Sequence, residues 1–157
     1  MHVLYNKNME QAYKDNFKEV LTAKQNVRDI MVVDGIHSLY SFLVEHEVPP
    51  MKRMTIIEAI VYYPLLVDGP INEDELHFIK VALNQENLSL KEANEIANRN
   101  KASKEIIFDA IKELSFIVMY EVLKVVLIGL IIDSNDQMND VEGSFFDELY
   151  YAVVDAM

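Results

Sequence analysis

The strongest constraint on the fold is an internal repeat, because the segment that begins at Asn72 recurs at Asn139. Each copy consists of an apolar segment, an aspartate, a short turn and an amphipathic segment, and the two copies span residues 54–84 and 119–152. The matching residues of the amphipathic segments are Asn72, Glu73, Glu75, Phe78 and Ile79 in the first copy and Asn139, Asp140, Glu142, Phe145 and Phe146 in the second. The repeat predicts two similar helix-loop-helix halves.

Helices are the expected elements of both halves, because no segment alternates cleanly between apolar and polar residues. Only four glycines and four prolines occur, and several of them lie at Pro49-Pro50 and Asp68-Gly69-Pro70. We therefore predict an all-α fold of about seven helices, with the two halves packed around buried central helices. The predicted helices cover residues 9–24, 27–44 with a break at Asp34-Gly35, 54–67 with a kink at Pro64, a segment after Asn72, a segment from Ser89, 114–132 and 140–154, with a linker at 98–101.

The most apolar segment, residues 114–132, is long enough to raise the question of a membrane span. Glu121 and Lys124 lie near its centre, and each such charge costs about 2.5 to 3.5 kcal/mol in the middle of a bilayer. We therefore expect a helix buried in the protein's own core and no membrane association.

The charge balance limits the classes of partner. The chain has 14 lysines and arginines against 26 aspartates and glutamates, which gives a formal net charge of -12. This field repels phosphate backbones and anionic membrane surfaces, so we expect no nucleic-acid partner. Cations and proteins with a basic surface are the favoured partners.

The remaining composition indicates a globular chain in a reducing compartment. Hydrophobic residues make up 51% of the sequence, enough for a sizeable core. Cysteine is absent, which excludes disulfides and thiolate metal sites, and the first residues contain no apolar run of signal-peptide length. We expect a cytoplasmic protein, with residues 1–50 as an N-terminal helical segment packed on the core of a domain formed by residues 51–157.

The first turn carries a resemblance to a known family. It reads Val67-Asp68-Gly69-Pro70-Ile71-Asn72-Glu73-Asp74-Glu75 and follows an apolar helix. Residues from about 54 to 157 resemble the TerB-like proteins of tellurite resistance and stress response, in which an alanine-rich helix, Asp-Gly and a capped helix start form each half. The second turn, residues 132–142, lacks the glycine and has a longer loop. The resemblance implies two facing helical halves whose acidic face associates with a metal ion.

Two asparagine–glutamate pairs have the spacing of a helix cap. Asn72 precedes Glu75 by three residues, and Asn139 precedes Glu142 by three residues. In a capping box the first side chain accepts a hydrogen bond from the third backbone N–H, and the glutamate accepts one from the first. We assign these four residues to helix capping.

Asp68 and Asp133 align in the repeat once two extra loop residues are allowed in the second copy. Each follows an apolar helix and so places negative charge at the negative end of the helix dipole. An aspartate in this unfavourable position in both copies points to a functional role. An aspartate that ends the helix by forming an Asx turn is the alternative, and the residues alone leave both interpretations open.

Facing halves would bring two sets of carboxylates together. The candidate ligands are Asp68, Glu73, Asp74, Asp133, Asp136 and Asp140. Oxygen ligands suit calcium or magnesium, and a bound cation relieves the repulsion among them. The second loop is not an EF-hand, because the glycine position counted from Asp133 holds Met138 and the twelfth position holds Ser144. We therefore consider a divalent cation as the cofactor.

Motifs of catalysis are missing from the sequence. The histidines are His2, His37, His46 and His77, and none belongs to a His-Glu-x-x-His motif. No glycine-rich phosphate loop and no Gly-x-Ser-x-Gly motif occurs either. We predict no enzymatic activity, and we expect His77 to be a surface histidine.

From Val125 onward the sequence contains seven acids and no lysine or arginine. Such a run is either a solvated face or a surface that recognises a basic protein, as an inhibitor or immunity protein requires. The predicted function is a non-enzymatic acidic binding module of the TerB-like stress or tellurite-resistance type that associates with a divalent cation. The alternative is an acidic interaction protein, of inhibitor or immunity type, that binds a basic partner without metal.

Overall fold

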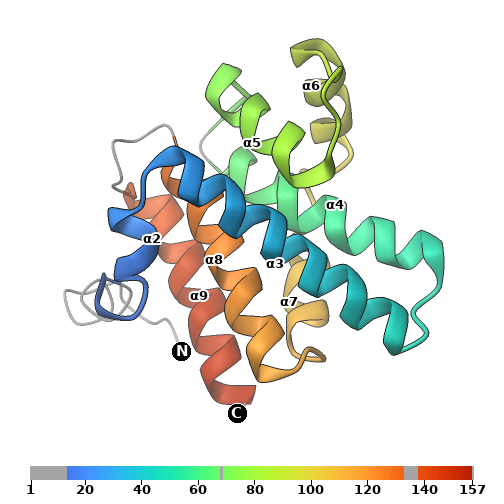
Figure 1. Ribbon diagram of the computed structural model, residues 1–157, viewed down its shortest axis with the longest axis vertical. Helices are drawn as coiled ribbons and strands as arrows, with labels where there is room; N and C mark the ends of the chain where they lie inside the picture. The colour runs from blue at the N-terminus through green and yellow to red at the C-terminus, as the bar shows by residue number, and fades with distance from the viewer. Residues whose placement is uncertain (1–13, 68, 133–137, 157) are drawn as a thin grey trace.

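The computed structural model describes residues 14–67, 69–132 and 138–156. Within these ranges the regular elements are helices and no strand occurs, which confirms the predicted all-α fold class (Figure 1). The helices are α2 (Lys18–Thr22), α3 (Gln25–Glu45), α4 (Pro50–Leu66), α5 (Glu73–Leu83), α6 (Leu90–Asn98), α7 (Lys104–Ile111), α8 (Phe116–Ile131) and α9 (Asp140–Ala156). Seven of these helices, α3 to α9, have eight residues or more, which equals the predicted number. The elements differ, because α7 was not predicted as a separate helix and the predicted helix over residues 9–24 is not among the seven.

The predicted break at Asp34-Gly35 is wrong, because α3 continues through both residues. Gly35 lies on the buried side of α3, against α8. A Cβ atom at this position would be 2.5 Å from Cγ2 of Val125 and 3.1 Å from the carbonyl oxygen of Glu121. The glycine therefore serves the close approach of two helices, and this packing offsets the cost of about 0.5–1 kcal/mol that glycine brings to a helix interior.

The predicted helix over residues 9–24 begins outside the described residues. Its described part is helical at residues 14–16, turns at Phe17 and continues as α2. The Phe17 ring is buried, stacked on Tyr120 at 5.3 Å between centroids and edge-on to Phe146 at 5.5 Å. This contact attaches the N-terminal segment to α8 and α9.

The other helix boundaries follow from local chemistry. α4 begins at Pro50, because proline fits the first helical position, and it runs through the buried Pro64 to end at Leu66. The predicted starts after Asn72 and Ser89 and at Asp140 are observed as the starts of α5, α6 and α9. The first copy of the repeat therefore corresponds to α4 and α5, and the second to α8 and α9.

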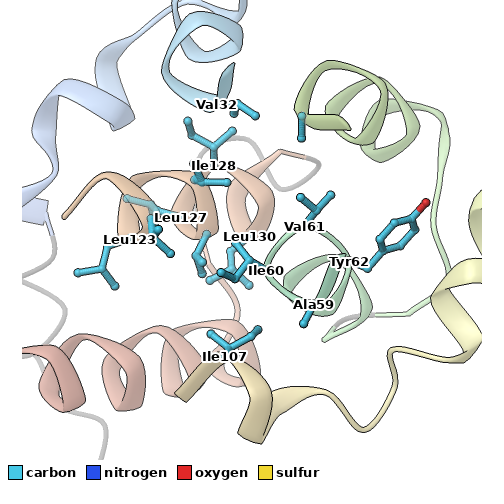
Figure 2. Packing of buried hydrophobic residues seen from close by; sticks show 14 of the residues in the cluster. Val32, Ala59, Ile60, Val61, Tyr62, Ile107, Leu123, Leu127, Ile128 and Leu130 are labelled. Carbon is cyan, nitrogen blue, oxygen red and sulfur yellow. The ribbon is translucent and has the colours of Figure 1, made fainter. Parts of the chain in front are cut away.

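α8 lies at the centre of the core, as expected for the most apolar segment. Most of its side chains are buried, with α3 packed along one side and α4 along another. Figure 2 shows Val32 of α3 directly above Ile128, and Ile60 of α4 beside Leu130. The two helices that correspond in the repeat, α4 and α8, are thus in direct contact. None of the helices described is both long and apolar enough to cross a membrane.

Candidate functional site

Both helix caps predicted for the repeat are formed. Asn72 Oδ1 accepts from the Glu75 N–H at 2.9 Å, and Glu75 Oε1 accepts from the Asn72 N–H at 3.0 Å. In the second copy, Asn139 Oδ1 accepts from the Glu142 N–H at 2.9 Å, and Glu142 Oε1 accepts from the Asn139 N–H at 3.1 Å. Glu75 and Glu142 are only 4% and 2% exposed, so these carboxylates lie away from solvent at equivalent places in the two halves.

A groove of about 980 Å³ lies between the two halves. The first copy contributes the end of α4 and the turn after it, and the second copy contributes the first turns of α9. α6, the connection after it and the start of α7 complete the lining. The residues that line the groove are Tyr63, Leu66, Val67, Gly69, Pro70, Asn94, Ala97, Asn98, Lys101, Lys104, Asp140, Val141, Ser144, Phe145 and Glu148.

Of the six predicted metal ligands, Asp140 is found in the lining of this groove. Glu73 and Asp74 lie in the first turn of α5, exposed to solvent and outside the lining. The other three, Asp68, Asp133 and Asp136, lie outside the described residues. In the part of the chain that is described, no three histidines or carboxylates are grouped so as to hold a metal ion.

The groove also contains two lysines that the sequence analysis did not anticipate. Lys101 and Lys104 both line it. The Lys104 ammonium lies 3.0 Å from Oε2 of Glu148 and 5.7 Å from the centre of the Phe108 ring. The acids of α9 are therefore accompanied by positive charge from α7, so the polar part of the lining has both signs.

One asparagine fixes the first turn against α6. Asn94 Oδ1 accepts from the Ile71 N–H at 3.1 Å, and Asn94 Nδ2 donates to the Ile71 carbonyl at 3.3 Å and to the Leu90 carbonyl at 3.1 Å. Ile71 directly follows the turn that lines the groove. The side chain of Asn94 therefore positions the turn, and a polar asparagine inside a helix was the available sequence signal for this role.

A second network fixes the end of α6 against α4. Arg99 donates to both carboxylate oxygens of Glu58, and Asn100 Nδ2 donates to Oε1 of Glu58 at 2.7 Å. The hydrogen bond from Arg99 is the main cause of the lowered pKa of Glu58. Burial, with a smaller contribution from Glu58, raises the pKa of Tyr62 to about 12. No local pattern in the sequence pairs residues 58 and 99.

His77 makes a contact that a purely exposed histidine would lack. Its Nε2 lies 3.0 Å from Oδ2 of Asp29, so the side chain joins α5 to α3 while remaining partly exposed. His77 is not among the residues that line the groove.

Comparison of the chain with protein-family models, curated proteins and solved structures gives no match. Functional inference therefore rests on the groove. Its lining combines apolar side chains with a few amides, ammonium groups and carboxylates, which is the usual composition of a ligand site.

Proposed function

We propose that the protein is a non-enzymatic acidic binding module of the TerB-like stress or tellurite-resistance type, and that its ligand site is the groove between the two repeats. One observation carries the proposal: the turn after α4 and the start of α9, which belong to different copies, line the same groove. The resemblance of the first turn to TerB-like proteins supports the same location.

A divalent cation, calcium or magnesium, is the first ligand that we propose. Asp140 lines the groove, and so do Val67 and Gly69, the sequence neighbours of Asp68. Carboxylate oxygens are the ligands that these hard cations take. Because Glu148 is paired with Lys104, Asp140 is the carboxylate of the lining that we choose for substitution.

Thermal unfolding with and without millimolar calcium or magnesium tests the cation. A ligand that binds only the native state raises the Tm. We expect a saturable rise for the wild type and a smaller rise for Asp140→Asn. Asp109→Asn is the matched control, because Asp109 is exposed on α7 outside the groove. For each protein the Tm with the cation is compared with the Tm without it, because removal of a repelling charge can itself raise the Tm of a variant. An unchanged wild-type Tm excludes the cation.

The second candidate is the acidic interaction protein that binds a basic partner without metal. It is favoured by the exposed carboxylates of Asp140, Glu148 and Asp155, which are spaced to share one face of α9. Glu148 also pairs with Lys104, so Asp140 and Asp155 are the members of this face outside that ion pair. α9 contains no lysine or arginine. Such a face attracts a positively charged surface over a distance set by the ionic strength.

Chelation separates the two candidates. We expect a labelled lysine-rich peptide to bind in EDTA, to dissociate as salt is added, and to bind Glu148→Gln/Asp155→Asn more weakly than wild type. Asp109→Asn is again the control. Binding that requires calcium or magnesium favours the first candidate, whereas binding that is unaffected by the α9 substitutions contradicts the second.

A further inference from the structure

The outer face of α3 exposes a row of apolar side chains. Ile30 is 59% exposed, Val33 49%, Tyr40 45% and Val44 43%, and His37, also exposed, lies among them. Their spacing of three and four residues places them on one side of the helix, along about 21 Å of its length. In Figure 1, α3 crosses in front of α8, and the two helices pack against each other.

This row is separate from the side of α3 that forms the core. The buried side consists of Val32, Gly35, Leu39 and Leu43, which lie against the rest of the molecule. α3 is therefore apolar on both sides, unlike a surface helix with one buried stripe and one polar face. Contiguous exposed apolar surface is typical of interaction sites. α3 contributes no residue to the groove between the repeats.

The apolar surface continues at the start of α4. Met51 and Met54 are 85% and 60% exposed there. Arg53, between them in sequence, lies 5.5 Å from the centre of the Tyr40 ring, and its Nη1 donates to the Val48 carbonyl at 2.8 Å. Arg53 thus holds the Tyr40 ring in place at the junction of α3 and α4. Methionine side chains adapt their shape to a partner more readily than branched ones.

Acidic residues accompany the row. Residues 25–47 contain the acids Asp29, Asp34, Glu45 and Glu47, the histidines His37 and His46, and a single arginine or lysine, Arg28. The Arg28 guanidinium is directed toward α2, where it donates to the carbonyl oxygens of Val20 and Leu21 at 3.0 and 3.1 Å. Asp34 and Glu45 are exposed beside the apolar residues.

We propose that the outer face of α3, defined by Ile30, Val33, Tyr40 and Val44, binds an amphipathic helix of a partner protein whose apolar stripe is flanked by lysine or arginine. Apolar side chains at heptad-like spacing accept such a stripe, and the flanking bases complement Asp34 and Glu45. A second copy of this chain suits the face less well, since it brings the same acids and a net charge of -12.

Fluorescence anisotropy with two labelled helical peptides tests the proposal. Both peptides have leucine at heptad positions, and one has lysine flanks while the other has glutamate flanks. We expect saturable binding of the lysine peptide to the full-length protein, at least tenfold tighter than binding of the glutamate peptide. Higher salt should narrow this difference, because the flanking charges are exposed.

Three variants locate the binding surface. Ile30→Gln/Val33→Gln/Val44→Gln should weaken lysine-peptide binding at least tenfold. The matched control, Phe116→Gln/Ile117→Gln, replaces exposed apolar residues at the start of α8 and should bind as wild type. Asp34→Lys/Glu45→Lys should reverse the preference between the two peptides while keeping every apolar residue, and it remains informative if the first variant folds poorly.

Four results would overturn the proposal. Equal binding by wild type and the charge-reversed variant excludes recognition at α3. Loss of binding in Glu148→Gln/Asp155→Asn with α3 variants unaffected places the partner on α9, which leaves the proposed function intact. Dimerisation in sedimentation equilibrium that disappears with the α3 substitutions identifies a second copy as the occupant. Binding to neutral phosphatidylcholine vesicles that disappears in the same way identifies a lipid surface.

Discussion

Arg99 donates two hydrogen bonds to the carboxylate of Glu58, from Nε at 2.7 Å and from Nη2 at 3.0 Å. This bidentate contact joins the end of α6 to the middle of α4. Asn98 and Lys101, which lie on either side of Arg99 in the sequence, line the groove. The ion pair therefore holds one wall of the groove in place.

We predict a pH-dependent loss of stability for Glu58→Gln. The pKa of Glu58 is lowered from 4.5, chiefly by the Arg99 hydrogen bond. A carboxyl group with a lower pKa in the folded state contributes stability above its unfolded pKa and loses that contribution as the pH falls through its folded pKa. The free energy of unfolding of Glu58→Gln should be below that of wild type at pH 7, and this deficit should shrink as the pH drops below 4.5.

Urea unfolding over this pH range measures the effect. Glu95→Gln is a suitable control, because Glu95 is an exposed glutamate on α6. A deficit of Glu58→Gln that is the same at every pH would contradict the role assigned to the carboxylate charge.

Gly35→Ala should destabilise the protein. The added methyl group would meet Cγ2 of Val125 at 2.5 Å and the carbonyl oxygen of Glu121 at 3.1 Å. Overpacking of this kind costs about 1–3 kcal/mol, more than the helix propensity gained by alanine. Denaturant unfolding of Gly35→Ala in the wild-type and Val125→Ala backgrounds provides a double-mutant cycle. We expect a smaller cost in the second background, and an equal cost in both would show that Val125 is not the obstacle.

Gly35 also illustrates what the sequence leaves undetermined. Glycine ends helices in some places and permits close helix packing in others, and the choice depends on what lies opposite. Here Val125 lies opposite, on a helix far along the chain, so the sequence predicted a break where α3 is continuous. The starts of the amphipathic helices could be predicted, because a capping box depends only on two residues three positions apart, as in Asn72 and Glu75.

The same distinction applies to the groove. Asp140 could be placed near the first turn from the repeat alone, because a repeat predicts that its halves pack in related ways. The ion pair between Lys104 and Glu148 could not be predicted, because it depends on how α7 packs against α9. The acids of α9 were correctly identified as a run without bases, but their neighbours in space come from another helix.

The two repeated caps allow a stability test of the repeat itself. Asn72→Ala and Asn139→Ala each remove the acceptor for a glutamate N–H, at 2.9 Å in both copies. Each substitution should lower the free energy of unfolding by about 0.5–2 kcal/mol. Asn26→Ala, at an exposed position in the first turn of α3, is the control and should have a small effect. If either cap variant unfolds like wild type in urea, that helix start does not depend on its asparagine.

The stability contribution of a tyrosine hydroxyl can be tested at two sites, Tyr120, whose hydroxyl is hydrogen-bonded, and Tyr62, whose hydroxyl has no partner among the described residues. The single hydroxyl proton of Tyr120 has two acceptors within reach, Oε1 of Glu19 at 2.9 Å and the Asn16 carbonyl oxygen at 3.2 Å. Tyr62 is fully buried, and its Oη has no hydrogen-bond partner among the described residues. Figure 2 shows its hydroxyl directed away from the aliphatic side chains of the core.

Replacement of each tyrosine by phenylalanine removes the same atom from both sites, so the chemical change is identical and only the surroundings differ. Tyr120→Phe should lower the free energy of unfolding by about 0.5–1.5 kcal/mol, because it removes net favourable hydrogen bonding. Tyr62→Phe should leave the free energy of unfolding unchanged or raise it, because a buried hydroxyl without a partner loses its hydrogen bonds to water on folding and gains none in the protein. Urea unfolding of both variants measures the difference. A larger loss for Tyr62→Phe than for Tyr120→Phe would mean that the buried hydroxyl is hydrogen-bonded in solution.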